Sequence, residues 1–185
     1  MLVRGKCEEL SRKRDQPNAF TWTSVVCGHF VDFGLWSGYL KFDLDKHHAQ
    51  ILDGGDVKAS MSTLQRVTDA LIRILSQPQR TQNKTLFIQS FCTTQLELLA
   101  SLERGTKVPW SREQVDSKAF LEHQLRHLEN GDKKAADEIV YALGLIEGDW
   151  TLRADFANCQ LGLEDENIDD VVAMVLSEHD QYKSY

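Results

Sequence analysis

The sequence lacks the glycine-rich loops that usually bind phosphate groups. None of its 11 glycines fits the spacing G-x-G-x-x-G or the phosphate-binding loop of nucleoside triphosphatases. Such loops place backbone N–H groups at the start of a helix, where they bind a pyrophosphate. The chain therefore carries no sequence signal of its own for the phosphates of a nucleotide.

The sequence is also poor in positive charge and in long apolar runs. Its 21 lysines and arginines are outnumbered by 28 acidic residues, which gives a net charge of −7. Because non-specific nucleic-acid binding needs a basic surface, we expect no nucleic-acid partner and no attachment to anionic lipid. No apolar stretch reaches the roughly 18 residues that span a bilayer, and the first ten residues are charged where a signal peptide is apolar. We therefore expect a cytoplasmic protein with no membrane contact.

Residues typical of metal sites are sparse. The cysteines form no C-x-x-C pair, which favours four reduced thiols, at Cys7, Cys27, Cys92 and Cys159. His123 and His127 have the spacing of a zinc pair on a helix, but Gln124 stands where such motifs have a glutamate. An exposed helix face is the commoner explanation, so we predict no metal site.

The stretch 81–103 shows the clearest local pattern. Leu86–Ile88 is a short apolar run flanked by polar residues, typical of a buried strand. Thr93 or Thr94 is a candidate N-cap, and Glu97 follows Thr94 at the spacing of a capping box. Leucines then recur at helical spacing. The pattern predicts a strand, a tight polar turn and an amphipathic helix, which is half of a βαβ unit.

The rest of the chain predicts one α/β domain in which strand–helix units precede a helical C-terminal portion. We expect a small, mainly parallel sheet flanked by helices, because strands alternate with helices in the first half. Ser62 or Thr63 begins a helix that ends before Pro78, and Asp53–Asp56 is a turn. Strands are predicted at 20–26, 49–52 and 58–61, and helices at 3–15, 117–129, 133–146 and 168–179.

Four blocks of the sequence resemble the isoflavone-reductase-like (NmrA-like) family, especially its fungal members, which are atypical short-chain dehydrogenases. The blocks run in the family's order and cover nearly the whole chain. They are FTWTSVVCGHFVDFGL (20–35), ILDGGDVKASMSTLQRVTDAL (51–71), NKTLFIQSFCTTQLELLASLE (83–103) and the tail from GDW through LGL to the closing helix.

This resemblance implies an NAD(P)-dependent oxidoreductase-like protein that reduces a small aromatic or otherwise unsaturated metabolite with NADPH. Family members have an N-terminal Rossmann half with a glycine-rich cofactor motif; residues 1–185 resemble the substrate-side half alone. Lys6 best matches the family's catalytic lysine, a general acid/base whose pKa has to be lowered for that work. Gly28, His29 and Phe30 match the loop that lies along the nicotinamide and the substrate.

The missing half has two implied consequences. A truncated chain without the pyrophosphate loop loses most of the family's affinity for NADP(H). The strand at 20–26 also becomes an edge strand, and an apolar edge favours self-association. A non-catalytic module that senses redox state or regulates a partner, and a truncated product with no activity, are the alternatives to the reductase.

Overall fold

The computed structural model describes residues 3–12 and 20–182, and it has the α/β fold that the sequence predicts. The strands of this part are β1 (Thr23–Val26), β2 (His29–Phe30), β3 (Phe42–Asp43), β4 (His48–Leu52), β5 (Ala59–Ser62), β6 (Lys84–Phe87), β7 (Phe91–Thr93) and β8 (Ser111–Val115). The helices are α1 (Val3–Arg12), α2 (Val31–Trp36), α3 (Leu64–Ser76), α4 (Pro78–Thr81), α5 (Gln95–Thr106), α6 (Ser117–Glu129), α7 (Lys134–Ile146), α8 (Asn158–Leu161) and α9 (Ile168–Tyr182).

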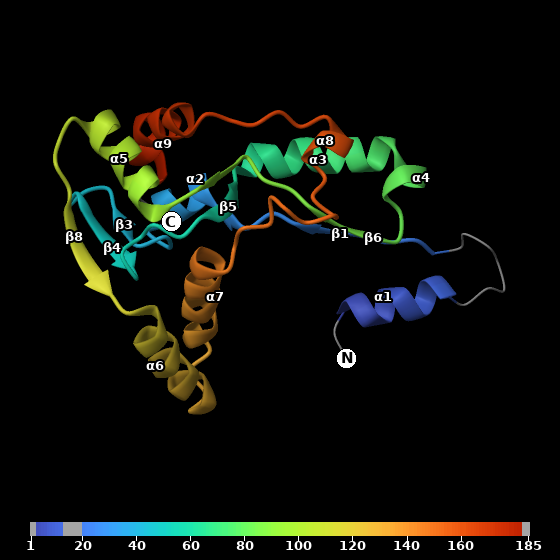
Figure 1. Cartoon of the computed structure of the whole chain (residues 1–185), viewed down its shortest axis with the longest axis horizontal. Helices are drawn as coiled ribbons and strands as arrows, with labels where there is room; N and C mark the ends of the chain where they lie inside the picture. The colour runs from blue at the N-terminus through green and yellow to red at the C-terminus, as the bar shows by residue number, and fades with distance from the viewer. Residues whose placement is uncertain (1–2, 13–19, 183–185) are drawn as a thin grey trace.

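Strands β1 and β6 form a parallel pair, and helix α3 packs on it. β1 and β6 pair in parallel, with Val25 opposite Leu86, and α3 lies between them in the sequence. α3 covers one face of the pair and α1 lies on the other side (Figure 1). Ala70 and Ile74 of α3 pack with Leu86 and Ile88 in a small apolar cluster, which fixes the helix on the strands.

The other strands form two small mixed sheets. β2 and β7 flank β5, in parallel and antiparallel pairing respectively. β4 lies between β3, which is antiparallel to it, and β8, which is parallel. The larger apolar cluster lies between these sheets and helices α2, α5, α7 and α9; Phe42, Ile51, Leu98, Leu102, Tyr141 and Val175 are among its buried members.

Helix starts follow the sequence closely. The Thr63 side chain accepts from the backbone N–H of Arg66 at the start of α3. Thr94 and Glu97 form the predicted capping box of α5, in which each side chain accepts from the other residue's backbone N–H. Gln95 then joins α5 to β4, because its side chain accepts from the N–H of Leu52 and donates to the carbonyl of Gln50. These caps were predictable since they depend on residues three positions apart.

The prediction that a tight turn alone separates β6 from α5 is wrong in part. Phe91–Thr93 forms β7, a strand that pairs antiparallel with β5, so a second strand separates β6 from α5. Phe91 and Thr93 are buried by this pairing. The predicted helix at 3–15 is described as α1 as far as Arg12, and its last three positions lie outside the described residues.

The C-terminal half contains a helical hairpin. α6 and α7 pack on each other and project away from the sheets (Figure 1). Asp53, in the turn after β4, accepts from the backbone N–H of Ser117 and so fixes the start of α6. Among the described helices, none combines the length and the apolar character needed to cross a bilayer.

Candidate functional site

The Gly28–Phe30 loop follows β1 at the carboxyl end of the parallel pair. Its last two residues form the short strand β2, which pairs in parallel with β5, so the prediction of a loop here is wrong in part. Ligands of open α/β sheets bind at this edge. Gly28 has a φ of +67°, and a side chain there would overlap the carbonyl oxygen of Ser60 and lie 2.8 Å from the Trp150 ring. Glycine is therefore required by packing against β5 and Trp150.

Trp150 closes this end of the sheet. Its indole N–H donates to the carbonyl of Ile88 at 3.2 Å, and its backbone N–H donates to the Ser60 hydroxyl at 3.3 Å. The ring meets Phe87 edge-on, with the centroids 5.6 Å apart. The Arg153 guanidinium lies over the Phe87 ring, 4.1 Å from its centroid. The sequence showed Trp150 only as part of the block that begins with GDW, because its partners are distant in the chain.

His29 points into the protein. It is 7% exposed, and its Nε2 atom lies 3.1 Å from the carbonyl oxygen of Tyr141 in α7. Because a carbonyl only accepts, Nε2 carries the proton and donates it. Burial lowers the pKa of His29, and the Tyr141 carbonyl opposes this shift in part. A side chain at Gly144 would lie 2.7 Å from the imidazole Cε1 atom, so α7 can reach the ring only because position 144 is glycine. The neutral ring therefore attaches α7 to β2.

Lys6 lies on α1, and its ammonium group pairs with the carboxylate of Glu9 at 3.0 Å. Its side chain is 53% exposed. Within residues 3–12 and 20–182, no hydrogen bond or ion pair joins Lys6 to the Gly28–Phe30 loop. The structure thus does not bring the predicted general acid/base and the predicted cofactor loop together.

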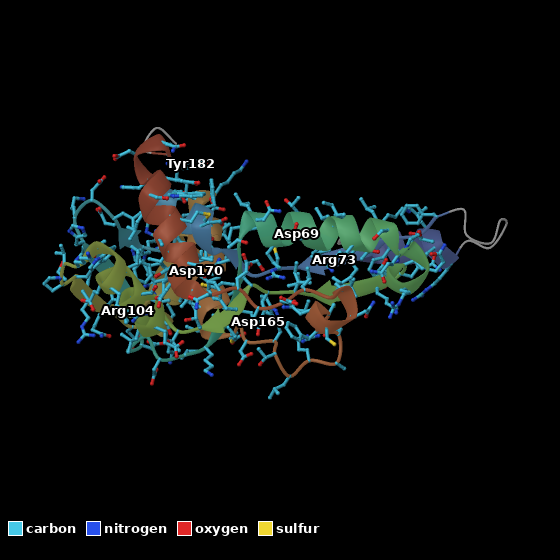
Figure 2. All side chains as sticks on the ribbon, turned by 90° about the horizontal axis from the view of Figure 1, so that it is seen from above. Asp69, Arg73, Arg104, Asp165, Asp170 and Tyr182 are labelled. Carbon is cyan, nitrogen blue, oxygen red and sulfur yellow. The ribbon has the colours of Figure 1, made fainter. Side chains whose placement is uncertain are left out.

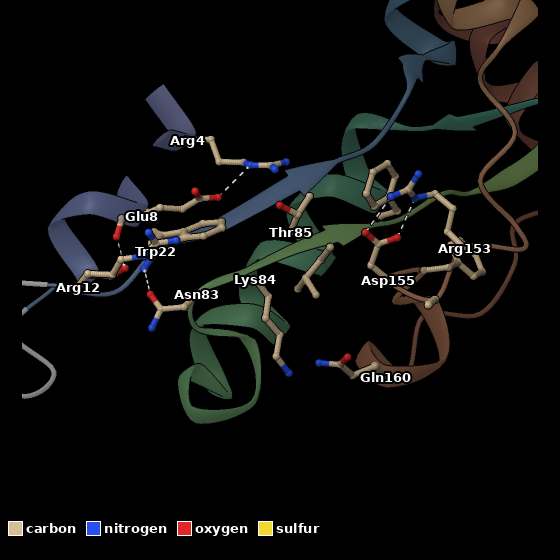
Figure 3. A pocket seen from close by; sticks show the side chains of 15 residues that line it. Arg4, Glu8, Arg12, Trp22, Asn83, Lys84, Thr85, Arg153, Asp155 and Gln160 are labelled. Atoms are coloured by element: carbon tan, nitrogen blue, oxygen red, sulfur yellow. Dashed lines mark hydrogen bonds and ion pairs between the residues drawn. The ribbon is translucent and has the colours of Figure 1, made fainter. Parts of the chain in front are cut away.

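A cavity of about 760 Å³ lies between α1, β6 and the segment 153–156 (Figure 3). Its basic side chains outnumber its acidic ones, and Arg4 pairs with Glu8 while Arg153 pairs with Asp155. Neither Lys6 nor the Gly28–Phe30 loop lines this cavity. The cavity is therefore separate from the predicted site.

The cysteines near the loop are poor nucleophiles. Burial raises the pKa of the Cys27 thiol and that of the Cys92 thiol, so both remain protonated at neutral pH. All four cysteines are free thiols. No three His, Cys, Asp or Glu side chains gather around a metal-sized space in the described part of the chain.

A polar cluster that sequence reasoning missed lies beyond β6. The Glu166 carboxylate accepts from the hydroxyls of Ser90 and Thr63 and pairs with Arg66 at 3.1 Å. Arg66 is 6% exposed, so its charge depends on this partner. The cluster attaches the segment before α9 to α3. No local pattern marks it, since Glu166 and Thr63 are about a hundred residues apart.

Comparison with known proteins finds oxidoreductases that are similar to this chain in sequence or in fold. The chain is 28% identical over 164 residues to the oxidoreductase aprR of Aspergillus flavus, and the match covers 87% of this chain and 55% of aprR. A crystal structure of isoflavone reductase superposes with a TM-score of 0.63 at 17% identity, covering 91% of this chain and 55% of that one. The NADPH complex of quinone oxidoreductase QOR2 from Escherichia coli gives 0.63 at 14% identity, covering 85% and 54%. No family model matches the chain.

In fold this chain resembles isoflavone reductase, and in sequence it resembles the fungal oxidoreductases aprR and poxI. It spans about half the length of the curated relatives it matches. Two of the similar structures, quinone oxidoreductase QOR2 from Escherichia coli and triphenylmethane reductase from Citrobacter, are complexes with NADPH and NADP(H) respectively.

The residues of this chain do not fit a complete NADP(H) molecule. No glycine-rich loop is present for the pyrophosphate. At the predicted nicotinamide loop, Trp150 occupies the space beside Gly28, and His29 is engaged with Tyr141. Gly28 and Phe30 are half-buried, whereas His29 is buried. The loop therefore offers backbone and the Phe30 ring to a ligand, and no chemical step through the cofactor follows from these residues alone.

Proposed function

We propose that this chain is the substrate-side part of an NAD(P)-dependent oxidoreductase-like protein that acts on a small unsaturated metabolite in the cytoplasm. The observation that supports this most is the close-packed loop after β1, where Gly28 contacts Ser60 and Trp150 at the ligand-binding edge of a parallel pair. In this proposal the Gly28–Phe30 loop borders the substrate and the nicotinamide. Lys6 is the candidate proton donor, and reaching the loop requires α1 to take another position.

A chimera tests the proposal. The matched part of aprR is replaced by this chain, and NADPH and NADH binding is measured by calorimetry beside the isolated 185-residue chain. We expect the chimera to bind NADPH and the isolated chain to bind it far more weakly, because residues 1–185 contain no glycine-rich loop for the pyrophosphate and the rest of the chimera would have to supply one. A chimera that unfolds cooperatively but binds neither cofactor would overturn the proposal.

The role of Lys6 is tested in the same chimera. Consumption of NADPH with a panel of unsaturated aromatic compounds is compared for Lys6→Ala and Arg4→Ala, which lie on the same helix. General acid catalysis contributes about 10²–10⁴-fold to a rate, so Lys6→Ala should lower kcat by at least about 100-fold with cofactor affinity unchanged. Equal activity in the two variants would remove Lys6 from the reaction.

The second candidate is a non-catalytic module that senses redox state or regulates a partner. The contact between Lys6 and Glu9 favours it, because this ammonium is held away from the loop. The chimera separates the two functions, since a sensor binds NADPH but consumes none with any compound of the panel.

A further inference from the structure

Two histidines lie side by side on the surface of helix α6. His123 and His127 are four positions apart, so they share one face of the helix. Their ring centroids are 4.4 Å apart, with 38° between the ring planes. Both side chains are exposed, and within residues 3–12 and 20–182 no hydrogen bond occupies the ring nitrogens of His123. Helix α6 lies far along the molecule from α1 and β1 (Figure 1), so this exposure does not depend on the strand edge near the start of the chain.

The distance between the rings matches two imidazoles that bind one metal ion. Bonds between a metal ion and a histidine nitrogen are about 2.0–2.1 Å long. When two such bonds meet at about 90°, as in the square-planar or tetragonal sites of Cu²⁺ and Ni²⁺, the ring centroids lie roughly 4.5 Å apart. A tetrahedral angle would need roughly 5 Å. The observed 4.4 Å therefore fits the tetragonal ions better than it fits zinc.

Asp132 orients one of the two rings. Its backbone N–H donates to the carbonyl of His127 at 3.0 Å, so the chain folds back over the last turn of α6. Gly131, with a φ of +90°, allows this reversal. The Asp132 carboxylate then lies 3.7 Å from Nδ1 of His127. Histidines that bind metal ions usually direct their second nitrogen at a carboxylate, so Nε2 of His127 is the atom left for an ion.

The charges near the pair favour a cation. His127 belongs to the last turn of α6, and the C-terminal end of a helix carries a partial negative charge. The whole chain has a net charge of −7. Arg126 is the opposing charge in the same turn. In the part of the chain that the structure describes, no third His, Cys, Asp or Glu completes a metal site here, so water would fill the other coordination positions.

We propose that His123 and His127 chelate one divalent transition-metal ion of the Cu²⁺ and Ni²⁺ class. The exposed helix face that the sequence predicts is the surface on which the ion binds, and the ion joins two successive turns of α6. Gln124 stands where zinc proteases have a catalytic glutamate, so the site binds an ion without hydrolytic chemistry. The proposal uses no residue of the Gly28–Phe30 loop or of α1 and is independent of the oxidoreductase function.

Calorimetric titration of the purified 185-residue chain with Ni²⁺ tests the proposal. Ni²⁺ is the probe because thiolates select Zn²⁺ and Cu⁺, and the four cysteines are free thiols. We expect one equivalent of Ni²⁺ to bind. His123→Ala should weaken this binding by roughly a hundredfold or more, because the second imidazole binds an ion that the first already holds close to it. Equal Ni²⁺ affinity in the two proteins would overturn the proposal.

A variant with displaced histidines separates geometry from composition. The double change His123→Gln, Arg126→His keeps all six histidines but makes the two on α6 adjacent, roughly 100° apart around the helix. It also removes a positive charge, which by itself favours a cation. Weaker binding in this variant therefore comes from the geometry of the pair, and full affinity would overturn the proposal.

Two carboxylate variants separate the orienting role of Asp132 from general attraction of cations. Asp132→Asn should weaken Ni²⁺ binding by roughly tenfold, the usual effect of losing a carboxylate behind a metal-bound histidine. Asp170→Asn makes the same change of charge at an exposed position of α9, labelled in Figure 2, and should leave the affinity as it is. Equal losses in the two variants would show that only the net charge matters and would contradict the proposal.

Hydrogen exchange locates the ion. Amides of residues 124–129 should exchange more slowly when Ni²⁺ is added to the wild-type chain, and His123→Ala should lose this effect. Protection elsewhere, with none in α6, would place the ion at another site and overturn the proposal. Cooperative thermal unfolding without metal shows that each variant is folded.

Discussion

Gly28 shows how much one position at the candidate site depends on packing. Its positive φ costs an ordinary residue about 1–2 kcal/mol, and a side chain would also overlap Ser60. We predict that Gly28→Ala lowers the free energy of unfolding by about 3 kcal/mol, because overpacking adds roughly 1–3 kcal/mol to the backbone term. Urea denaturation measures the change.

Gly38→Ala is the control for this prediction. Gly38 has a φ of +69° and no atom within 4 Å of the position that a side chain would take. It should lose the backbone term alone, about 1 kcal/mol. Equal losses in the two variants would show that contact with Ser60 and Trp150 is unimportant.

His29 predicts a dependence of stability on pH. Burial holds its pKa in the folded state below the usual 6.5, so the unfolded chain binds the proton more tightly. Its contribution to stability is therefore complete above pH 6.5 and is lost as the pH falls below that value. His29→Gln keeps a donor for the Tyr141 carbonyl and should flatten this part of the stability profile. Urea denaturation at several pH values measures the profile of each protein.

At the scale of elements, the start of α5 is the part most directly encoded by sequence. Thr94→Ala removes the side chain that accepts from the Glu97 N–H and should cost about 1 kcal/mol in urea denaturation. The exposed Thr68→Ala, whose hydroxyl donates to a carbonyl within α3, should change stability by less than about 0.5 kcal/mol. Adding Glu97→Ala to Thr94→Ala should cost less than the two single changes together, since the box is reciprocal.

The helix starts that depend on a local sequence pattern were predictable. The pairing of strands that lie far apart in the sequence was not. Helices α3 and α5 begin at caps that the sequence shows. β7 was missed because Phe91–Thr93 is only three residues long and is a strand through its pairing with β5. The candidate site divides in the same way. Gly28 could be placed after a strand, but its contacts with Ser60 and Trp150 join segments that lie far apart in the chain.

At the scale of the whole molecule, two apolar clusters of unequal size divide the structure. The smaller one holds α3 to β1 and β6, and β1 has one open edge. Stability within a protein varies with the apolar contacts of each part. We therefore predict that amides of β1, β6 and α3 exchange faster than those of β4, α5 and α9 in native-state hydrogen exchange.

Urea added below the unfolding midpoint should widen the difference between the two groups of amides. If both groups exchanged at one common rate, the two clusters would unfold as a single unit.

The sequence by itself determined the fold class, the main helices and the resemblance to isoflavone-reductase-like proteins, because these depend on periodicity, caps and order along the chain. Only the tertiary structure decided where the predicted site residues lie. It turned His29 inward to Tyr141, filled the space at Gly28 with Trp150, and placed Lys6 beside Glu9 on a separate helix. These contacts join residues distant in the chain, and their geometry is set by how the elements pack.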